Sequence, residues 1–428
     1  MRLCPIFKWS IQCPSHPAAF IGNTTISYKE LNHLVESECN FIESLHLPTQ
    51  SRLPFIAANT LETASFFFAA WRMKMVACPL SFRLPKAGIE KALLRLNASL
   101  ITPQSIPAKD QKHTELDETL LATLLFTSGT TGEPKIACHR LFQHLKSAEV
   151  AIPHLQLGQQ SRYLSNLPFS HVGGIALLLR TFLAGSALVI SSHFKDATHI
   201  SCVPTQLYRR MQEKTIVPDQ SILLGGAPIS LNLYNQAIEQ KLNLYTTYGM
   251  TETSSMMTLK KPENNSFSLG SPLEHSELRI ETDGEILVRG KTLFDGYLNL
   301  DGSISLPLKD GWFATKDRGY LKEGCLHFLG RKDRLFISGG ENIQPEEIEE
   351  AILALFNLSH AVVLPFEDEE FGMRPAVYLD DPTLTLEVMQ RNLRKVLPGY
   401  KIPQKLFPLS PTFTLKIDAG SDSETLQH

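Results

Sequence analysis

The sequence predicts an α/β protein: a large N-terminal body of parallel-sheet α/β subdomains plus a small β subdomain, followed by a small α+β C-terminal domain. Helix-like and strand-like segments alternate over residues 20–101, as they do where crossover helices join parallel strands. Beyond residue 331 the pattern changes to strands mixed with helices expected at 345–355 and 386–397. The 428 residues, 43% hydrophobic and 20% charged, have an ordinary globular composition and suffice for two or three domains.

The N-terminal elements follow from the spacing of apolar residues. Residues 28–45 and 61–73 have helical spacing, whereas residues 53–57 and 76–80 are short apolar runs typical of strands. Residues 102–118 are polar and contain prolines, which indicates a surface loop.

Three later strands share one pattern, a short apolar run that ends in a loop of small residues. The runs cover residues 121–126, 222–224 and 242–245, and the loops read TSGTTGEPK, GGAP and TTYGMTE. In parallel sheets such loops gather at the carboxyl edge of the strands, so we expect a ligand site there. Residues 277–297 show short alternating runs with turns, which predicts an antiparallel β subdomain.

Charge and cysteine content disfavour several classes of protein. A formal net charge of −3 predicts no attraction of the whole molecule to nucleic acid or to anionic membranes. The seven cysteines are dispersed and form no C-x-x-C pair, which favours reduced thiols and a cytoplasmic location. Residues 172–190 are apolar, but Arg180 at their centre would cost about 2.5–3.5 kcal/mol in a bilayer. We therefore expect a buried helix, no membrane insertion and a small-molecule substrate.

The loop after residue 126 has the composition of an anion cradle. It combines backbone donors, hydroxyls and an ammonium without a bulky side chain, in Thr127, Ser128, Gly129, Thr130, Thr131, Gly132 and Lys135. A Walker loop needs four residues between its glycines, whereas only two separate Gly129 from Gly132, so a P-loop kinase or GTPase is disfavoured. The alternative is an ordinary turn rich in Ser, Thr and Gly.

The TSGTTGEPK loop resembles the phosphate loop of the AMP-forming adenylate synthetases, which include acyl-CoA synthetases, luciferases and peptide-synthetase adenylation domains. The resemblance continues in order through GGAP at 225–228, YGMTE at 248–252, GWFATKDRG at 311–319 and GRKDRLFISGGENIQPEEIE at 330–349. It implies a reaction in which a carboxylate attacks the α-phosphorus of ATP and a thiol then displaces AMP. It also implies ATP, Mg²⁺ and coenzyme A as cofactors or co-substrates.

Residues of these motifs suit that reaction. Tyr248 offers an aromatic face for a purine, Thr251 a hydroxyl for a phosphoryl oxygen, and Glu252 a hard oxygen ligand for Mg²⁺. Asp317 and Arg331 can bind ribose hydroxyls, although either one alone could be a surface ion pair. The resemblance implies all of these contacts, and it adds nucleotide contacts from Gly226, Ala227 and Gly249.

The resemblance also implies a catalytic lysine near the end of the chain, for which the candidate is Lys416. The family pattern is incomplete there, because Leu415 stands where the family usually has Gly and Ala419 where it usually has Arg. A third departure is Lys316, since the family usually has Gly before the ribose-binding Asp. A structural role for Lys416 is the alternative, and two nearby lysines could be its alignment partners instead: Lys401 and Lys405.

By resemblance the chain divides into an AMP-binding domain, residues 1–332, and a mobile C-terminal domain, residues 333–428, with a hinge at Asp333. Rotation at the hinge would replace Lys416 by the loop of Gly339 and Gly340, which would approach the pantetheine of coenzyme A. A simple hairpin turn over residues 338–341 is the alternative interpretation.

Arg180 gives the main indication of the acid. It lies nine residues after His171 in an apolar segment, where a buried arginine must find an anion or several carbonyls. The pattern H-V-x-G followed by this arginine resembles the o-succinylbenzoate-CoA ligases of menaquinone biosynthesis. That resemblance implies that Arg180 holds one of two substrate carboxylates and that His171 lines the acyl pocket. The alternatives are a salt bridge of Arg180 with Glu252 or Asp196, and a core role for His171.

Three functions stay open from the sequence. The leading one is a CoA ligase for o-succinylbenzoate, the second a CoA ligase for another aryl or acyl acid, and the third a degenerate, non-catalytic adenylate-binding protein. The oligomeric state is also open between a monomer and a homo-oligomer.

Overall fold

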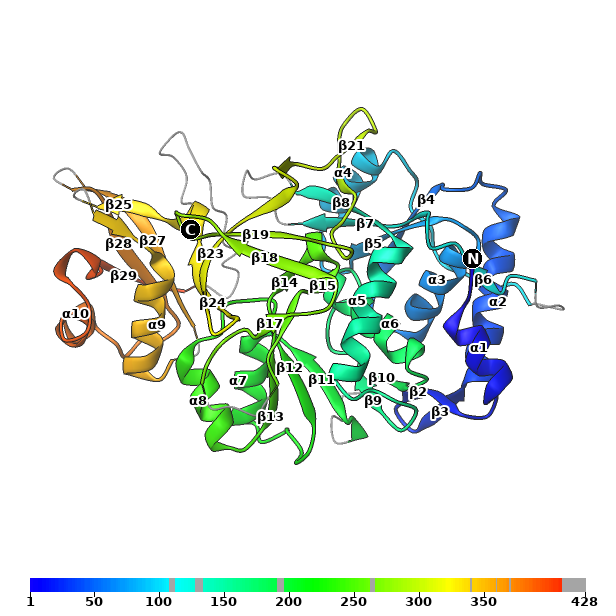
Figure 1. Cartoon of the computed structure of the whole chain (residues 1–428), viewed down its shortest axis with the longest axis horizontal. Helices are drawn as coiled ribbons and strands as arrows, with labels where there is room; N and C mark the ends of the chain where they lie inside the picture. The colour runs from blue at the N-terminus through cyan, green and yellow to red at the C-terminus, as the bar shows by residue number, and fades with distance from the viewer. Residues whose placement is uncertain are drawn as a thin grey trace.

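Two mixed sheets form the N-terminal body in the computed structural model, which describes residues 1–107, 112–127, 134–190, 196–261, 266–338, 341–358, 360–368 and 371–409 (Figure 1). The seven-stranded sheet is parallel except for its last pair, β2/β3. Its order is β13 (Asn243–Thr246), β12 (Ser221–Leu224), β11 (His199–Cys202), β9 (Arg162–Leu164), β10 (Ala187–Ile190), β2 (Pro17–Ile21) and β3 (Thr24–Ser27).

The six-stranded sheet is parallel over β4, β5 and β7 and antiparallel from β7 onward. Its order is β21 (Ile304–Ser305), β20 (Gly296–Leu298), β8 (Lys135–Arg140), β7 (Leu121–Thr127), β5 (Val76–Ser81) and β4 (Arg52–Ala57). β8 therefore follows β7 as a hairpin partner rather than through a crossover helix, so the sheet is mixed where the strand-and-loop pattern at residues 121–126 predicted a parallel one.

Helices fill the space between these sheets and cover their outer faces (Figure 1). One hydrophobic core joins Phe55 of the six-stranded sheet, Phe67 and Leu178 of intervening helices, and Leu188 of the seven-stranded sheet. Ser27 caps α2 in a capping box with Glu30, which explains where that helix begins. The helices of the body are α1 (Pro5–Gln12), α2 (Tyr28–Ser44), α3 (Leu61–Arg72), α4 (Lys86–Leu96), α5 (Leu141–His154), α6 (Val172–Leu183), α7 (Pro204–Gln212) and α8 (Leu231–Glu239).

An antiparallel subdomain follows the body. The alternating pattern predicted it over residues 277–297, of which residues 296–297 instead belong to β20 of the six-stranded sheet. Its sheet contains β18 (Ser276–Ile280), β19 (Glu285–Gly290), β23 (Trp312–Lys322), β22 (Leu308–Lys309) and β24 (Cys325–Arg331). Three two-stranded ribbons complete the body: β1 (Arg2–Leu3) with β6 (Glu115–Leu116), β14 (Gly249–Met250) with β15 (Ser255–Met256), and β16 (Thr258–Leu259) with β17 (Ser271–Pro272).

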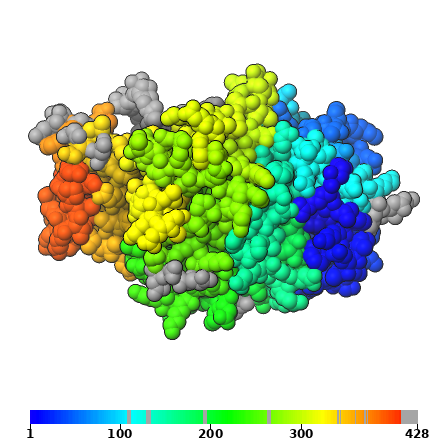
Figure 2. All heavy atoms as spheres, viewed as in Figure 1, coloured from blue at the N-terminus to red at the C-terminus, as the bar shows by residue number. Residues whose placement is uncertain are grey.

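The C-terminal residues form an α+β unit with its own hydrophobic core, which includes Phe336, Ile348, Val377 and Leu393. In Figure 2 its orange and red atoms make up one end of the molecule. Its elements are β25 (Phe336–Ser338), β26 (Glu341–Ile343), α9 (Pro345–Phe356), β27 (Ala361–Asp368), β28 (Gly372–Leu379), α10 (Leu386–Leu393) and β29 (Lys405–Pro408). β29 lies parallel to β28, whereas the other strand pairs of the sheet are antiparallel.

Three local predictions were wrong. Residues 172–190 form a helix and then a strand, α6 and β10, rather than one helix. Gly185 lies in the turn between them with φ +71°, which a residue with a side chain adopts at a cost. Both segments are buried, so the apolar run alone did not separate them. The loop predicted over residues 102–118 contains strand β6, and α10 is shorter than expected. Among the residues described, no helix combines the length and apolar character needed to cross a bilayer.

Candidate active site

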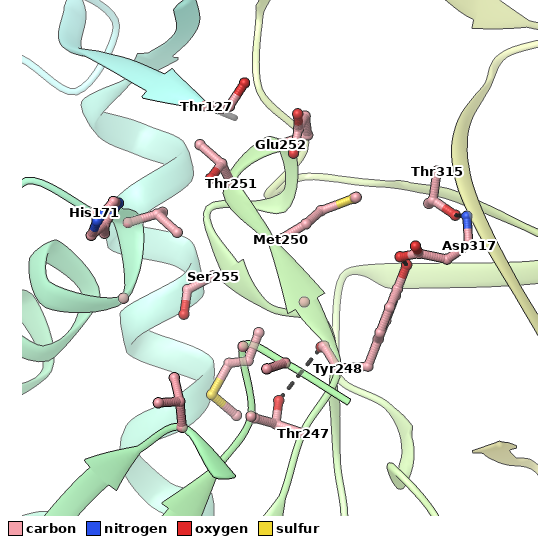
Figure 3. A pocket seen from close by; sticks show the side chains of 18 of the residues that line it. Thr127, His171, Thr247, Tyr248, Met250, Thr251, Glu252, Ser255, Thr315 and Asp317 are labelled. Carbon is pink, nitrogen blue, oxygen red and sulfur yellow. Dashed lines mark hydrogen bonds between the residues drawn. The ribbon is translucent and has the colours of Figure 1, made fainter. Parts of the chain in front are cut away.

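A cavity of about 980 Å³ opens where the two large sheets meet the antiparallel subdomain. The carboxyl end of β7 and the segments that follow β12 and β13 contribute to its wall, although β7 belongs to a different sheet from β12 and β13. The ligand site expected at the carboxyl ends of these strands is therefore one cavity shared by both sheets (Figure 3). Gly226, which has φ +78°, and Ala227 lie in its wall.

One end of the cavity carries a hydrogen-bonded group of four side chains. The Tyr248 hydroxyl donates to Oδ2 of Asp317 at 2.7 Å, and Nη1 of Arg331 donates to Oδ1 of Asp317 at 3.0 Å. The other edge of the Arg331 guanidinium donates to both carboxylate oxygens of Asp333, at 3.0 and 2.7 Å. Burial raises the pKa of Asp317 despite the opposing effect of Arg331. Asp317 is only 6% exposed and lines the cavity with Tyr248 and Arg331, so its pairing with Arg331 is not a surface ion pair.

Lys316 adopts a backbone conformation that favours glycine. Its φ is +62°, its N–H donates to Oε1 of Glu285 at 3.1 Å, and it lines the cavity beside Asp317. A lysine in this left-handed backbone conformation costs the folded state about 1–2 kcal/mol. This backbone geometry gives a physical reason for the glycine that the resemblance leads us to expect at this position.

We expect Lys316→Gly to raise the free energy of unfolding by ~0.5–1 kcal/mol, because relief of strain outweighs the extra entropy of glycine in the unfolded chain. Urea unfolding monitored by fluorescence measures this change. Lys316→Ala removes the same ammonium but keeps the strain, so it is the matched control. Equal stability of the two variants would contradict a strained backbone at this residue.

The cavity also receives both ends of the predicted phosphate loop. Thr127 ends β7 and Lys135 begins β8, and the Thr127 hydroxyl donates to the Lys135 carbonyl at 3.5 Å. The Lys135 ammonium lies 4.6 Å from the centroid of the Tyr297 ring, within cation–π range. Five predicted loop residues lie outside the described part of the chain: Ser128, Gly129, Thr130, Thr131 and Gly132.

Glu252 is the candidate metal ligand, and it lies near Lys135 because both side chains contact Tyr297. It lies in a 3₁₀ turn, Thr251–Thr253, and its Oε1 accepts from the Tyr297 hydroxyl at 2.6 Å. Within the described residues no group of three His, Cys, Asp or Glu side chains could hold a metal ion alone. Mg²⁺ commonly binds one or two carboxylates together with substrate phosphates, so the donor set fits a magnesium ion that arrives with a nucleotide.

The opposite end of the cavity carries Arg180 and His171, both from the region of α6. Arg180 is 2% exposed, and its Nη2 donates to the Ser255 hydroxyl at 3.2 Å. Its buried Nε has no hydrogen-bond partner among the described residues. Burial lowers the pKa of the guanidinium, and Tyr163 partly opposes this effect. No carboxylate of the described chain forms an ion pair with Arg180, and Glu252 contacts Tyr297 instead.

A tight ribbon brings Ser255 to Arg180. In the β14/β15 pair Gly249 faces Met256, and a Cβ on Gly249 would lie 1.9 Å from the Ser255 carbonyl oxygen. Only glycine permits this approach. Ser255 itself has φ +101°, an uncommon value for a residue with a side chain. Sequence reasoning missed both Ser255 and Tyr297, because neither belongs to a site motif that we could interpret.

Two predicted site residues, Gly340 and Lys416, lie outside the described residues, as does Gly339. On either side of the glycine pair, Ser338 and Glu341 face each other across the antiparallel pair β25/β26. The two strands that flank the glycine pair are therefore antiparallel neighbours, as the hairpin alternative predicts.

Comparison with known proteins identifies the family. A model described as AMP-binding enzyme matches residues 96–298. The 2-succinylbenzoate–CoA ligase of Escherichia coli K12 is 34% identical over 343 residues, which cover 76% of this chain and 76% of the relative. The chain belongs to the AMP-binding enzyme family. This AMP-binding enzyme is therefore an AMP-forming ligase, as the sequence motifs predicted.

Solved structures of relatives agree with the fold of this AMP-binding enzyme. The o-succinylbenzoate coenzyme A synthetase of Bacillus subtilis in complex with the acyl-adenylate intermediate OSB-AMP has a TM-score of 0.86 at 27% identity, covering 95% of this chain and 94% of that one. The same protein in complex with ATP and magnesium ion has a TM-score of 0.86 at 26% identity, covering 95% and 96%. The predicted fold class is confirmed.

Proposed function

We propose that this enzyme is a 2-succinylbenzoate–CoA ligase. A carboxylate oxygen attacks the α-phosphorus of ATP, the bond to the β-phosphate bridging oxygen breaks, and pyrophosphate leaves. The CoA sulfur then attacks the acyl carbon of the adenylate, a thioester forms and AMP leaves. Attack of an anion on a polyanion needs charge neutralisation and positioned donors more than it needs a general base. The names of the similar ligases support this choice of acid.

The observation that carries the proposal is the buried Arg180. Its guanidinium lies in the cavity wall with the hydroxyls of Ser255 and Tyr163 as partners, and its Nε has no partner among the described residues. A buried cation of this kind requires an anion, and a second carboxylate on the substrate would supply one. His171 also lies in the cavity wall, at the N-terminal end of α6.

We propose the remaining roles from the family resemblance, supported for the described residues by their position in the cavity. Tyr248 packs against the purine, Asp317 and Arg331 bind the ribose hydroxyls, and Thr251 contacts a phosphoryl oxygen. Asp317 can accept further hydrogen bonds, because each carboxylate oxygen has two lone pairs and uses one for the contacts seen. Glu252 would hold Mg²⁺, which neutralises phosphate charge when bound. The polyphosphate would lie against the loop of Thr127, Ser128, Gly129, Thr130, Thr131, Gly132 and Lys135, near Gly226, Ala227 and Gly249.

We also propose that residues 1–332 and 333–428 are separate domains with a hinge at Asp333. The separate core of the C-terminal unit supports this division. Lys332 binds Asp283 and Glu285 on the body at 2.7 Å each, so any rotation would begin after a fixed residue. Gly340 would then line the path of coenzyme A.

We place the enzyme in the cytoplasm, where ATP and CoA are supplied and where its seven free cysteines would stay reduced. Its partners would be a carboxylic acid, ATP and CoA, with neither nucleic acid nor membrane insertion involved. Light scattering would distinguish a monomer from a homo-oligomer.

One assay tests the choice of acid: AMP formation by pure protein with ATP, Mg²⁺ and CoA. We expect the fastest turnover with 2-succinylbenzoate in a panel with benzoate, coumarate and octanoate. Turnover of monocarboxylates alone would reassign the enzyme to another aryl or acyl acid. No turnover with any acid would favour a degenerate, non-catalytic adenylate-binding protein.

A further inference from the structure

Strand β8 connects the two parts of the site that must bind one polyphosphate. It begins at Lys135, where the phosphate loop ends, and four residues later it carries the fully buried His139. The His139 Nε2 lies 2.7 Å from the carbonyl oxygen of Thr251. Since a carbonyl only accepts, Nε2 carries the proton and donates it. A side chain of the phosphate-loop strand thus contacts the backbone of the Thr251–Glu252 turn.

Two further buried side chains orient His139. Its ring stacks on that of His144 from α5, with centroids 4.7 Å apart and an interplanar angle of 29°. The hydroxyl of Thr123, on the neighbouring strand β7, lies 2.8 Å from Nε2 of His144 and 3.5 Å from Nδ1 of His139.

One arrangement of protons leaves no buried N–H of this group without an acceptor. In it His144 Nε2 donates to Thr123, Thr123 donates to His139 Nδ1, and His139 Nε2 donates to Thr251. The atom left without a described partner is then His144 Nδ1, as an acceptor, which costs less than an unpaired donor. Each group thus donates to the next, from His144 through Thr123 and His139 to the Thr251 carbonyl in the site.

The Glu252 side of the turn is tied to the same strand. The Phe294 N–H donates to the Glu252 carbonyl at 2.8 Å, and the Asp295 N–H donates to the Cys138 carbonyl of β8 at 2.9 Å. The Tyr297 hydroxyl holds the Glu252 carboxylate, and Tyr297 pairs with β8 through β20. His139 therefore completes a frame that holds Thr251 and Glu252 against the phosphate-loop strand.

We propose that His139, oriented by Thr123 and His144, is a positioning residue that fixes the Thr251–Glu252 turn relative to the phosphate loop for binding of ATP with Mg²⁺. The inference rests on the proposed function only in its use of ATP. The ribose end is held separately by Asp317 and Arg331, so loss of His139 should affect the metal-bound triphosphate and spare AMP.

Calorimetry without any acid tests the proposal, because ATP then binds without reacting. For His139→Leu we expect the affinity for ATP in the presence of Mg²⁺ to fall about tenfold or more, the effect typical of residues that orient a metal ligand. Affinity for AMP without Mg²⁺ should change less than about twofold. His139→Gln restores an N–H near the Nε2 position and should recover most of the lost affinity. Thr123→Val, which removes the hydroxyl at similar volume, should give a smaller loss of the same kind.

His199→Leu is the matched control. His199 is also buried and also donates through Nε2 to a backbone carbonyl, that of Leu155 at 2.9 Å. Leu155 does not line the cavity, whereas Thr251, the partner of His139, does. We expect this variant to melt at a lower temperature with an unchanged ratio of the two affinities. The proposal is overturned if His139→Leu weakens AMP and ATP equally, leaves both unchanged, or is not rescued by Gln. If the wild type binds both nucleotides but ligates no acid, the proposed function fails and the positioning role stands.

Discussion

Replacing Arg180 by methionine should lower kcat/KM for 2-succinylbenzoate by about 10³-fold, equivalent to ~4 kcal/mol. Methionine keeps much of the length and apolar character of the arginine stem but offers no charge. The second carboxylate of the substrate would then be buried without a partner, which is the costly outcome for a desolvated anion. Steady-state AMP formation with 2-succinylbenzoate measures the loss, and AMP affinity should not change because Tyr248, Asp317 and Arg331 are intact.

The same substitution should stabilise the ligand-free protein. Arg180 is buried, and one of its nitrogens has no hydrogen-bond partner in the described part of the chain, so its removal should add about 1–3 kcal/mol to the free energy of unfolding. Benzoate is the matched substrate, since it has no second carboxylate for Arg180 to bind. Proportional loss of activity with benzoate and with 2-succinylbenzoate would show that Arg180 supports the fold of the pocket rather than the choice of acid. Arg180→Lys should lose less, because it keeps the charge but not the two-pronged geometry.

The elements that could be predicted from sequence are those whose signals are local. The helix at α2 begins at a capping box, and the loops after β7, β12 and β13 follow short buried runs. Which strands pair with one another is not set by a local sequence signal. β7 and β8 are antiparallel neighbours, whereas β12 and β13 belong to the other sheet, and nothing in the three similar loops distinguished these cases.

The same distinction between local signals and long-range contacts applies to the candidate site. Tyr248, Asp317 and Arg331 could be predicted because they lie in recognisable motifs, and the structure brings them into one hydrogen-bonded group. His139 and Ser255 could not, because their roles depend on contacts with Thr251 and Arg180 that are 112 and 75 residues away in sequence. At such separations, folding decides which polar groups meet, and no spacing rule predicts it.

Lys416→Ala should lower the rate of adenylation by at least about 100-fold and leave thioester formation from preformed adenylate nearly unchanged. The first step brings a carboxylate against a triphosphate, so it needs a cation at the reacting phosphorus. Of the described cations that line the cavity, Arg331 is neutralised by Asp317 and Asp333, and Lys135 lies against Tyr297. The other two are Arg180, at the opposite end, and Lys316, beside Asp317. The second step starts from a single phosphate and a neutral acyl group, where one cation fewer matters less.

The two nearby lysines serve as controls, because each has another contact in the C-terminal unit. Lys401 forms an ion pair with Glu347 at 2.5 Å, and the Lys405 ammonium lies 4.1 Å from the centroid of the Phe366 ring. Alanine at either position should leave adenylation within about twofold of the wild type, because exposed contacts of this kind contribute little. ATP–pyrophosphate exchange measures the first step, and release of AMP from synthetic 2-succinylbenzoyl adenylate by CoA measures the second. Equal loss of both steps in Lys416→Ala would argue for a structural lysine, whereas loss of the first step alone in Lys405→Ala would transfer the catalytic role to that residue.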